Sequence, residues 1–196
     1  VTWIKDIEGI FTAHQQAANT VTSSMFWVVD ADAEVADDFD FSYMPDVYDQ
    51  DVVHVWNSVN PITGQEYGYG GVKLFNTQQV REATSWGLDF TTGLSSRFKA
   101  MPQISNITRF NTDEFSTWRS AFRECVKLTA NADEESRTRL SGWLNPVTDA
   151  RYRDQALAGA KDGISYAKEF ANKPLKMAKI NDYEWLEDYY NEQYKS

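Results

Sequence analysis

The chain has 196 residues, 42% of them hydrophobic and 14% aromatic, which is enough apolar material for one compact domain and too much for a disordered tail. Its 19 basic and 29 acidic residues give a net charge of -10, which excludes a broad basic face for nucleic acid. The single cysteine, Cys125, excludes an intramolecular disulfide and a cysteine-based zinc site. No apolar run approaches the roughly 20 residues of a membrane span, so we expect a cytoplasmic protein without a membrane partner.

The first segment predicts a strand, a helix and a second strand. Residues 1–5, VTWIK, are a strand candidate, and apolar residues recur at helical spacing from Gly9 to Thr22, with Asp6 as a predicted cap. Met25–Val29 is a continuous apolar run, typical of a strand that is buried on both faces of a parallel sheet. This order predicts a right-handed βαβ unit whose two strands are parallel.

The middle of the chain predicts two further strands and a helix. An acidic, aromatic loop at residues 37–51 leads into a strand candidate at 52–56, VVHVW. Residues 66–75, EYGYGGVKLF, indicate a loop rich in glycine that runs into a strand. Residues 76–86, NTQQVREATSW, are typical of a capped helix.

From about Thr112 the pattern is helical almost to the end, with breaks near Asn131, Asn145 and Lys173. We therefore predict one α/β domain over residues 1–196. Its mostly parallel sheet core spans 1–110, and a helical C-terminal layer spans 111–196.

Three Asp-x-Asp triplets occur, where chance alone predicts roughly 1.5, so the triplet by itself carries no information. Only Asp30 and Asp32 follow a predicted buried strand, and ligands of open α/β sheets bind outside the carboxyl ends of strands. Residues i and i+2 of a strand project to the same side, so both carboxylates could face one Mn²⁺ or Mg²⁺ ion. The alternative interpretation is a solvated strand end.

Glycines and basic residues supply candidate phosphate ligands. Gly70 and Gly71 would let the backbone approach a phosphate, although simple turn geometry explains them too. Lys73 could reach the same cleft or lie on the solvent face. Arg119 and Arg123 could hold a diphosphate bidentately or form a solvated helical stripe.

Histidines and helix-start acids are weaker candidates. His54, central in a predicted strand, could be a third metal ligand, whereas His14 on an apolar helix face is typical of a core histidine. Asp113 could act as a base, but capping explains an acid at a helix start. The sequon at Asn106 is interpreted as an accident.

Five blocks, MFWVVDADAEV, FDFSY, VHVW, EYGYGGVKLF and FRECVKL, occur in this order over roughly residues 1–130. Together they resemble GT-A type glycosyltransferase-like proteins encoded by tailed bacteriophages. The resemblance implies a Rossmann-like GT-A core in which Asp30 and Asp32 hold Mn²⁺ or Mg²⁺ bound to a nucleotide sugar. Such proteins begin with a further strand and helix, so the match raises the hypothesis that the chain lacks a first βα unit.

The resemblance also implies an activity, the transfer of a sugar from a nucleotide-sugar donor to an acceptor hydroxyl in the host cytoplasm. A modified base of phage DNA is a natural acceptor for such an enzyme. Glu124 is the base candidate by its likeness to the acidic residue that opens a late helix in these enzymes, and Asp113 competes with it. The sugar, the nucleotide, the acceptor, the stereochemical course and the oligomeric state stay open.

Two other classes of protein stay open. A haloacid dehalogenase-type phosphatase also has a strand that ends in Asp-x-Asp, but Glu34 stands where that class has Thr or Val. A non-catalytic phage protein with a transferase-like fold would use exposed aromatic residues near the C-terminus to bind a partner. These aromatic residues, which could equally dock on the protein's own core, are Tyr183, Trp185, Tyr189, Tyr190 and Tyr194.

Overall fold

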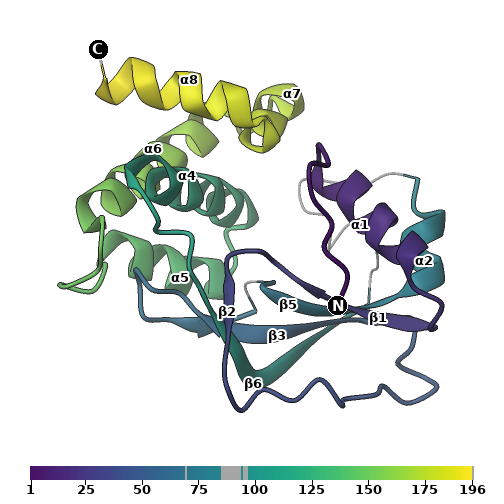
Figure 1. The fold of residues 1–196 in the computed structure, drawn as a ribbon. Helices are drawn as coiled ribbons and strands as arrows, with labels where there is room; N and C mark the ends of the chain where they lie inside the picture. The colour runs from purple at the N-terminus through teal and green to yellow at the C-terminus, as the bar shows by residue number, and fades with distance from the viewer. Residues whose placement is uncertain (69, 85–93, 95–96, 196) are drawn as a thin grey trace. The chain divides into compact units, whose positions relative to one another are not determined.

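The computed structural model describes residues 1–68, 70–84, 94 and 97–195, which fall into two compact units (Figure 1). The first unit comprises residues 1–59 and 66–108, and the second comprises 60–65 and 109–196. The boundary after Thr108 lies close to the predicted change of character near residue 111. The sequence did not predict that residues 60–65 belong to the second unit. The packing of both parts as one domain stays a prediction.

The first unit is a mixed α/β structure, built on a sheet whose strand order in the described residues is β1-β5-β3-β6-β2, with β4 paired to β3. Among the strand pairs that the structure describes, only β3–β6 is parallel, and the others are antiparallel. The prediction of a mostly parallel sheet is therefore wrong in its pairing. The strands are β1 (Met25–Val29), β2 (Ala33–Val35), β3 (Val53–Val59), β4 (Glu66–Tyr67), β5 (Val72–Asn76) and β6 (Phe98–Thr108).

Strand direction nevertheless brings three carboxyl ends together. Strands β1 and β3 are both antiparallel to β5, and β6 is parallel to β3, so β1, β3 and β6 run the same way. We call the side of the sheet where these three strands end and β5 begins the carboxyl edge. In the described sheet β1 is a terminal strand with Val29 43% exposed, so its predicted place in the interior is wrong.

The predicted strand at residues 1–5 is also wrong, since this segment is not a strand and pairs with none of the described strands. The predicted βαβ unit is therefore wrong as well. The helix that follows, α1 (Ile10–Thr20), is confirmed, although Gly9 rather than Asp6 precedes it, with no side-chain cap. Helix α2 (Thr77–Glu82) is confirmed with its cap, because Asn76 Oδ1 accepts a hydrogen bond from the backbone N–H of Gln79 at 3.0 Å. Residues 85–86 of that predicted helix lie outside the described residues.

Helices α1 and α2 lie on the same face of the sheet (Figure 1). The core between them and the strands consists of Ala18, Phe26, Val53, Val55, Phe75 and Val80. The prediction that His14 is a core histidine is confirmed, because its Nδ1 lies 2.7 Å from the carbonyl of Ile10 and its ring meets the Phe75 ring edge-on. Phe39 and its neighbours in the loop after β2 pack with Trp56 and Leu74 in a second cluster.

Strand β6 was not predicted, and Pro102 explains why. Met101 is opposite Trp56 and Ile104 is opposite Asn57, so the register shifts across Pro102 and Gln103. Proline has no N–H to donate to a ladder and is tolerated at such bulges. A proline inside the segment hid a long strand from pattern reasoning.

The second unit is helical, as predicted, and its helices break where the sequence indicates. Asp113, Asp133 and Asp182 each cap a helix by accepting a hydrogen bond from the backbone N–H three residues later. No helix among the described residues is long and apolar enough to cross a membrane. The helices are α4 (Glu114–Asn131), α5 (Glu134–Leu144), α6 (Arg153–Phe170), α7 (Pro174–Met177), the 3-10 helix η1 (Ala178–Asn181) and α8 (Tyr183–Tyr194).

Helices α4 and α6 approach closely because α6 presents glycines to the backbone of α4. A Cβ atom at Gly159 would lie 2.3 Å from the carbonyl oxygen of Trp118, and one at Gly163 would lie 2.4 Å from that of Phe122. Trp118, Phe122 and Cys125 are fully buried, as predicted. No larger side chain fits at the two glycines without moving a helix.

The aromatic residues of α8 serve mainly the core of the second unit. Leu186 and Tyr190 are buried among residues of α4 and α6, and Trp185 and Tyr189 pack against the same cluster. Tyr183 and Tyr194 stay 54% and 45% exposed. For most of these aromatics the structure agrees with the alternative in which the last helix docks on its own core.

Candidate functional site

Asp30 and Lys73 meet at the carboxyl edge of the first unit. Strand β1 ends at Val29, and the backbone N–H of Asp30 donates to the carbonyl of Gly71 at 2.8 Å, which continues the pairing with β5. Lys73 lies on β5, opposite Val28 of β1. Its Nζ atom lies 3.0 Å from both Oδ1 and Oδ2 of Asp30, so the ammonium contacts the whole carboxylate.

The two partners differ in burial. The side chain of Lys73 is 5% exposed and that of Asp30 is 38% exposed. Lys73 is therefore not on a solvent face, and that interpretation of the sequence is wrong. A charged ammonium is tolerated at so buried a position because the adjacent carboxylate balances it.

Glycines adjoin this ion pair. Gly70 has φ +96°, a conformation that favours glycine, and a Cβ atom there would lie 3.6 Å from Nζ of Lys73. A Cβ atom at Gly71 would lie 2.5 Å from Nδ2 of Asn106, which occupies that space. Gly71 is thus explained by packing and Gly70 by its backbone conformation, and Gly70 places no side chain against the ammonium.

A buried polar network also lies at the carboxyl edge and was missed by sequence reasoning. Ser105 Oγ donates toward the carbonyl of Asn57 and Oδ1 of Asn106, and Asn106 Nδ2 donates to Thr108 Oγ1 at 3.1 Å. Ser58, Ser105, Asn106 and Thr108 are at most 1% exposed. The sequence signal that could have revealed this network is the alternation of polar residues at the end of β6, which contains the sequon. The asparagine of the sequon, Asn106, is buried in the fold.

Asp32 does not continue the strand. The backbone N–H of Ala33 donates to the carbonyl of Asp30 at 3.0 Å, which closes a tight turn with Asp32 as its third residue. The premise that Asp30 and Asp32 project to one side of a strand is therefore wrong, because β1 ends at Val29.

The residues around Asp30 do not fit a divalent metal as the structure arranges them. Among the described residues, no group of three or more His, Cys, Asp or Glu side chains could hold a metal ion. That alone does not decide the question, since Mg²⁺ often binds one or two carboxylates plus phosphate and water. The decisive feature is Lys73, whose ammonium contacts both oxygens that a metal would need.

His54 is remote from Asp30. His54 on β3 is opposite Leu74 on β5, and Leu74 is opposite Trp27 on β1. Trp27 precedes Asp30 by three residues, so His54 lies two strands away from Asp30 and roughly 10 Å along the strand direction. It is fully buried beside the rings of Tyr43 and Trp56. Burial lowers the pKa of His54, and the nearby positive charge of Lys99 lowers it further. The structure makes it a neutral core histidine.

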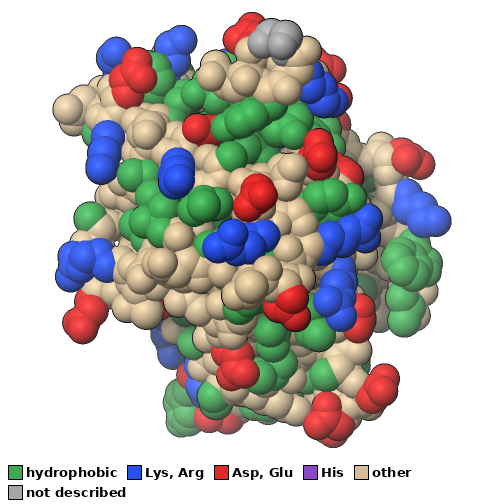
Figure 2. Space-filling view, turned by 90° about the vertical axis from the view of Figure 1, so that its left-hand side faces the viewer, with side chains coloured by type: hydrophobic (Ala, Val, Ile, Leu, Met, Phe, Trp, Pro, Cys, Tyr) green, Lys and Arg blue, Asp and Glu red, His purple; other side chains and the backbone are tan. Residues whose placement is uncertain are grey.

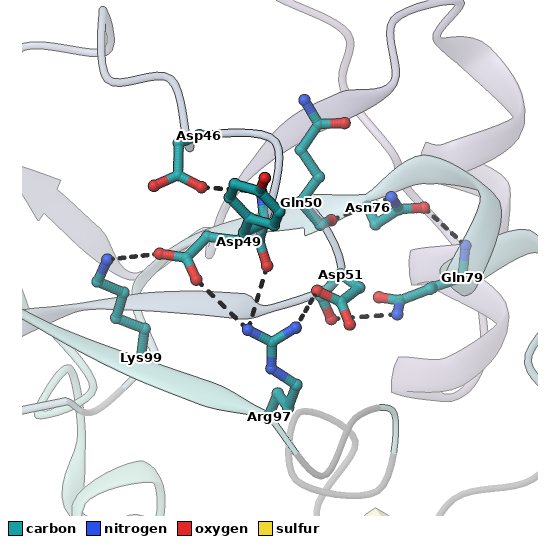
Figure 3. A network of polar contacts seen from close by, with 9 residues as sticks. Asp46, Asp49, Gln50, Asp51, Asn76, Gln79, Arg97 and Lys99 are labelled. Atoms are coloured by element: carbon teal, nitrogen blue, oxygen red, sulfur yellow. Dashed lines mark hydrogen bonds and ion pairs between the residues drawn. The ribbon is translucent and has the colours of Figure 1, made fainter.

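The third Asp-x-Asp triplet forms a network at the opposite side of the sheet, where β3 and β6 begin (Figure 3). Asp49 accepts from Lys99 at 2.8 Å and from Arg97 at 3.4 Å, and Asp51 accepts from Arg97 at 2.5 Å. The hydrogen bond from Lys99 lowers the pKa of Asp49. The second triplet serves a turn, because Asp40 accepts from the backbone N–H of Ser42 at 2.9 Å. Each triplet has an internal role.

Glu124, the predicted base, lies in the second unit. Its side chain is 5% exposed, and its Oε1 accepts a hydrogen bond from Nη2 of Arg139 at 2.7 Å. Asp113, the competing base, caps α4 and accepts hydrogen bonds from Ser116 and Thr112. Desolvation raises the pKa of Asp113, but these hydrogen bonds outweigh it and lower the pKa. Both acids therefore have structural partners.

The two arginines of the predicted stripe also contact their own unit. The guanidinium of Arg119 lies over the Tyr183 ring at 4.4 Å and near the Phe115 ring at 5.7 Å. Arg123 donates from Nε to the carbonyl of Ile180 at 2.7 Å, and from Nη2 to Asn181 at 3.0 Å. Arg123 thus ties α4 to η1, and neither arginine belongs to a purely solvated stripe.

The fold and the site together define a mixed α/β protein with a lysine–aspartate pair at the carboxyl edge of its sheet. Comparison with models of protein families, with curated proteins and with solved structures found no match to this chain.

Proposed function

We propose that the protein is a glycosyltransferase of the GT-A type that binds the phosphates of a nucleotide sugar at the carboxyl edge of the first unit. The observation that carries the proposal is the buried ammonium of Lys73, located at this edge beside Gly70 and Asp30. Ligands of open α/β sheets bind outside the carboxyl ends of the strands. An ammonium is a common protein partner for a phosphate oxygen.

Strand direction supports a ligand site at the carboxyl edge. Three strands, β1, β3 and β6, point toward the carboxyl edge although they are not all neighbours. The reversed strand β5 lies between β1 and β3 and brings Lys73 next to the end of β1. An edge of this kind places backbone and side-chain groups from several strands around one ligand.

The reaction would transfer a sugar to an acceptor hydroxyl, whose proton a carboxylate would accept. Glu124, in the second unit, is the base candidate that the resemblance implies. Asp113 is the weaker candidate, because its lowered pKa and its three hydrogen bonds make it a poorer proton acceptor. No step proposed here depends on the Mn²⁺ or Mg²⁺ that the resemblance implies, because the residues around Asp30 do not fit a divalent metal as the structure arranges them.

The acceptor must suit an acidic surface. On the face that Figure 2 shows, Lys and Arg side chains are scattered among acidic and hydrophobic ones. With a net charge of -10, tight nonspecific binding of DNA is disfavoured. If a modified DNA base is the acceptor, local contacts around that base must supply the affinity.

The test is to measure the release of nucleoside diphosphate from a panel of sugar nucleotides. The parent should consume at least one donor, and Lys73→Met should lower kcat/KM by roughly 10²-fold or more, because it removes a charged phosphate partner. Lys99→Met is the matched control, since Lys99 pairs with Asp49 away from the carboxyl edge and should leave turnover unchanged. A parent protein that consumes no donor in the panel, with or without Mn²⁺, contradicts the proposal.

A second candidate function, non-catalytic binding of a partner protein, is favoured by the loop before β3. This loop exposes large hydrophobic side chains, and exposed apolar clusters mark interaction sites more often than single apolar residues do. The exposed side chains are Phe41 at 42%, Met44 at 73%, Val47 at 72% and Tyr48 at 82%. The donor assay separates the two functions, because only the first consumes a sugar nucleotide.

A further inference from the structure

We propose that Lys73 is the built-in counter-cation of Asp30, and that the carboxyl edge binds a phosphate group without a divalent metal. The phosphate part of this inference rests on the proposed function, whereas the exclusion of the metal depends only on the ion pair. The sequence blocks resemble proteins that hold a metal with these aspartates. In this chain an ammonium stands at the first of them.

Geometry sets the ammonium and a metal in competition. Nζ of Lys73 lies 3.0 Å from each oxygen of Asp30. A bound Mg²⁺ would have to approach one of these oxygens to roughly 2.1 Å. It would then lie within a few ångströms of the ammonium, where two positive charges repel each other strongly in a partly buried setting. Asp30 can therefore serve one of the two cations at a time.

Burial decides this competition in favour of Lys73. The lysine side chain is 5% exposed, and its strand runs between β1 and β3, with Val28 and Val55 opposite the lysine. Loss of the Asp30 carboxylate to a metal would leave a buried cation without its balancing charge. A hydrated metal ion that leaves Asp30 simply returns to water. The ion pair between Lys73 and Asp30 is therefore more favourable than metal binding at Asp30.

The ammonium also retains capacity for a ligand. A lysine ammonium has three N–H donors. In the described part of the chain, the hydrogen bonds of Nζ go to the two oxygens of Asp30, which leaves one donor. Gly70 has no side chain, and a Cβ atom at this position would lie 3.6 Å from Nζ. A phosphate oxygen of a nucleoside diphosphate is the ligand chemistry that fits a buried cationic donor with one remaining N–H.

The first experiment measures Mn²⁺ binding to the protein alone by electron paramagnetic resonance. We expect no saturable Mn²⁺ binding to the parent. Lys73→Met should gain saturable binding of Mn²⁺, because the substitution removes the competing charge. The double variant Asp30→Asn with Lys73→Met should lose that gain, and Lys99→Met should behave as the parent. Saturable binding of Mn²⁺ to the parent that Asp30→Asn abolishes overturns the inference.

The second experiment measures the affinity for UDP, GDP and ADP by calorimetry, once with EDTA and once with Mn²⁺. We expect one of these nucleotides to bind equally well in both conditions and to lose affinity by about tenfold or more in Lys73→Met. Binding that requires Mn²⁺ overturns the inference and leaves the proposed function intact. If no nucleotide binds while the Mn²⁺ results are as expected, the phosphate part and the proposed function fail, and the role of Lys73 as counter-cation stands.

Discussion

The ammonium of Lys73 contacts both carboxylate oxygens of Asp30 at 3.0 Å, and the two partners are unequally buried. Removal of Asp30 leaves a cation that water scarcely reaches. Removal of Lys73 leaves a carboxylate that is 38% exposed and can be hydrated. The energetic consequences of the two deletions should therefore differ, because an uncompensated charge costs most where it is most buried.

Asp30→Asn should lower the free energy of unfolding by about 2–4 kcal/mol, whereas Lys73→Met should lower it by about 1 kcal/mol or less. Urea denaturation of both variants measures the difference. The double variant should be nearly as stable as Lys73→Met, because Asp30 no longer has a buried cation to balance. Equal losses in the two single variants would show that the pair is not asymmetric.

His54 should make stability depend on pH. Burial lowers its pKa in the folded state, and Lys99 adds to this shift, while Asp49 and a backbone contact oppose it. The unfolded state therefore binds a proton first as the pH falls below about 6.5. The stability present above that pH should decrease toward lower pH by up to about 1.4 kcal/mol per pH unit from this group.

Urea denaturation of the parent and of His54→Phe between pH 7 and pH 5 checks this prediction. Phenylalanine keeps a ring beside Tyr43 and Trp56 but cannot bind a proton. The parent should lose more stability than the variant over this range. The same pH dependence in both proteins would assign the effect to other groups.

Gly159→Ala should destabilise the second unit, because the new Cβ atom would lie 2.3 Å from the carbonyl oxygen of Trp118 on α4. Overpacking against a backbone typically costs about 1–3 kcal/mol, which exceeds the gain in helix propensity of about 1 kcal/mol. Gly142→Ala is the matched control. Its Cβ atom would meet only the end of the flexible Gln65 side chain, also at 2.3 Å, so this variant should be neutral or slightly stabilised. Thermal denaturation of both variants decides.

Arg139→Met should lower the free energy of unfolding by about 2–4 kcal/mol, because the Glu124 side chain that it balances is only 5% exposed. Glu124→Gln should cost less, since an amide oxygen can still accept the hydrogen bond from Arg139. Chemical denaturation compares the two variants. A larger loss in Glu124→Gln would contradict the assigned burial of the pair.

The same substitution tests the proposed base. If Glu124 accepts the proton of the acceptor hydroxyl, Glu124→Gln should lower turnover by roughly 10²–10⁴-fold with little change in donor binding. Donor consumption and donor affinity are measured on the folded fraction of the variant. Full turnover in Glu124→Gln would place the base elsewhere, with Asp113 next to be tested.

Local patterns in the sequence determined much of the secondary structure. The residues of β1 were predicted because a run of large apolar residues ends at an aspartate. The helices of the second unit were predicted because helical periodicity and capping act within a few residues, as Asp182 illustrates at the start of α8. His14 was placed in the core for the same reason, since its helix face is set by spacing alone.

Only the tertiary structure decided which strands are neighbours and which charges meet. The apolar run Met25–Val29 is compatible with a central or a terminal strand, and its pairing with β5 depends on residues far along the chain. Asp30 and Lys73 are 43 residues apart, and their contact arises because the reversed strand β5 lies beside β1. The sequence indicated an acidic pair suited to a metal. The fold placed a buried ammonium there instead, because strand pairing, which no local pattern encodes, selects the partner of a charge.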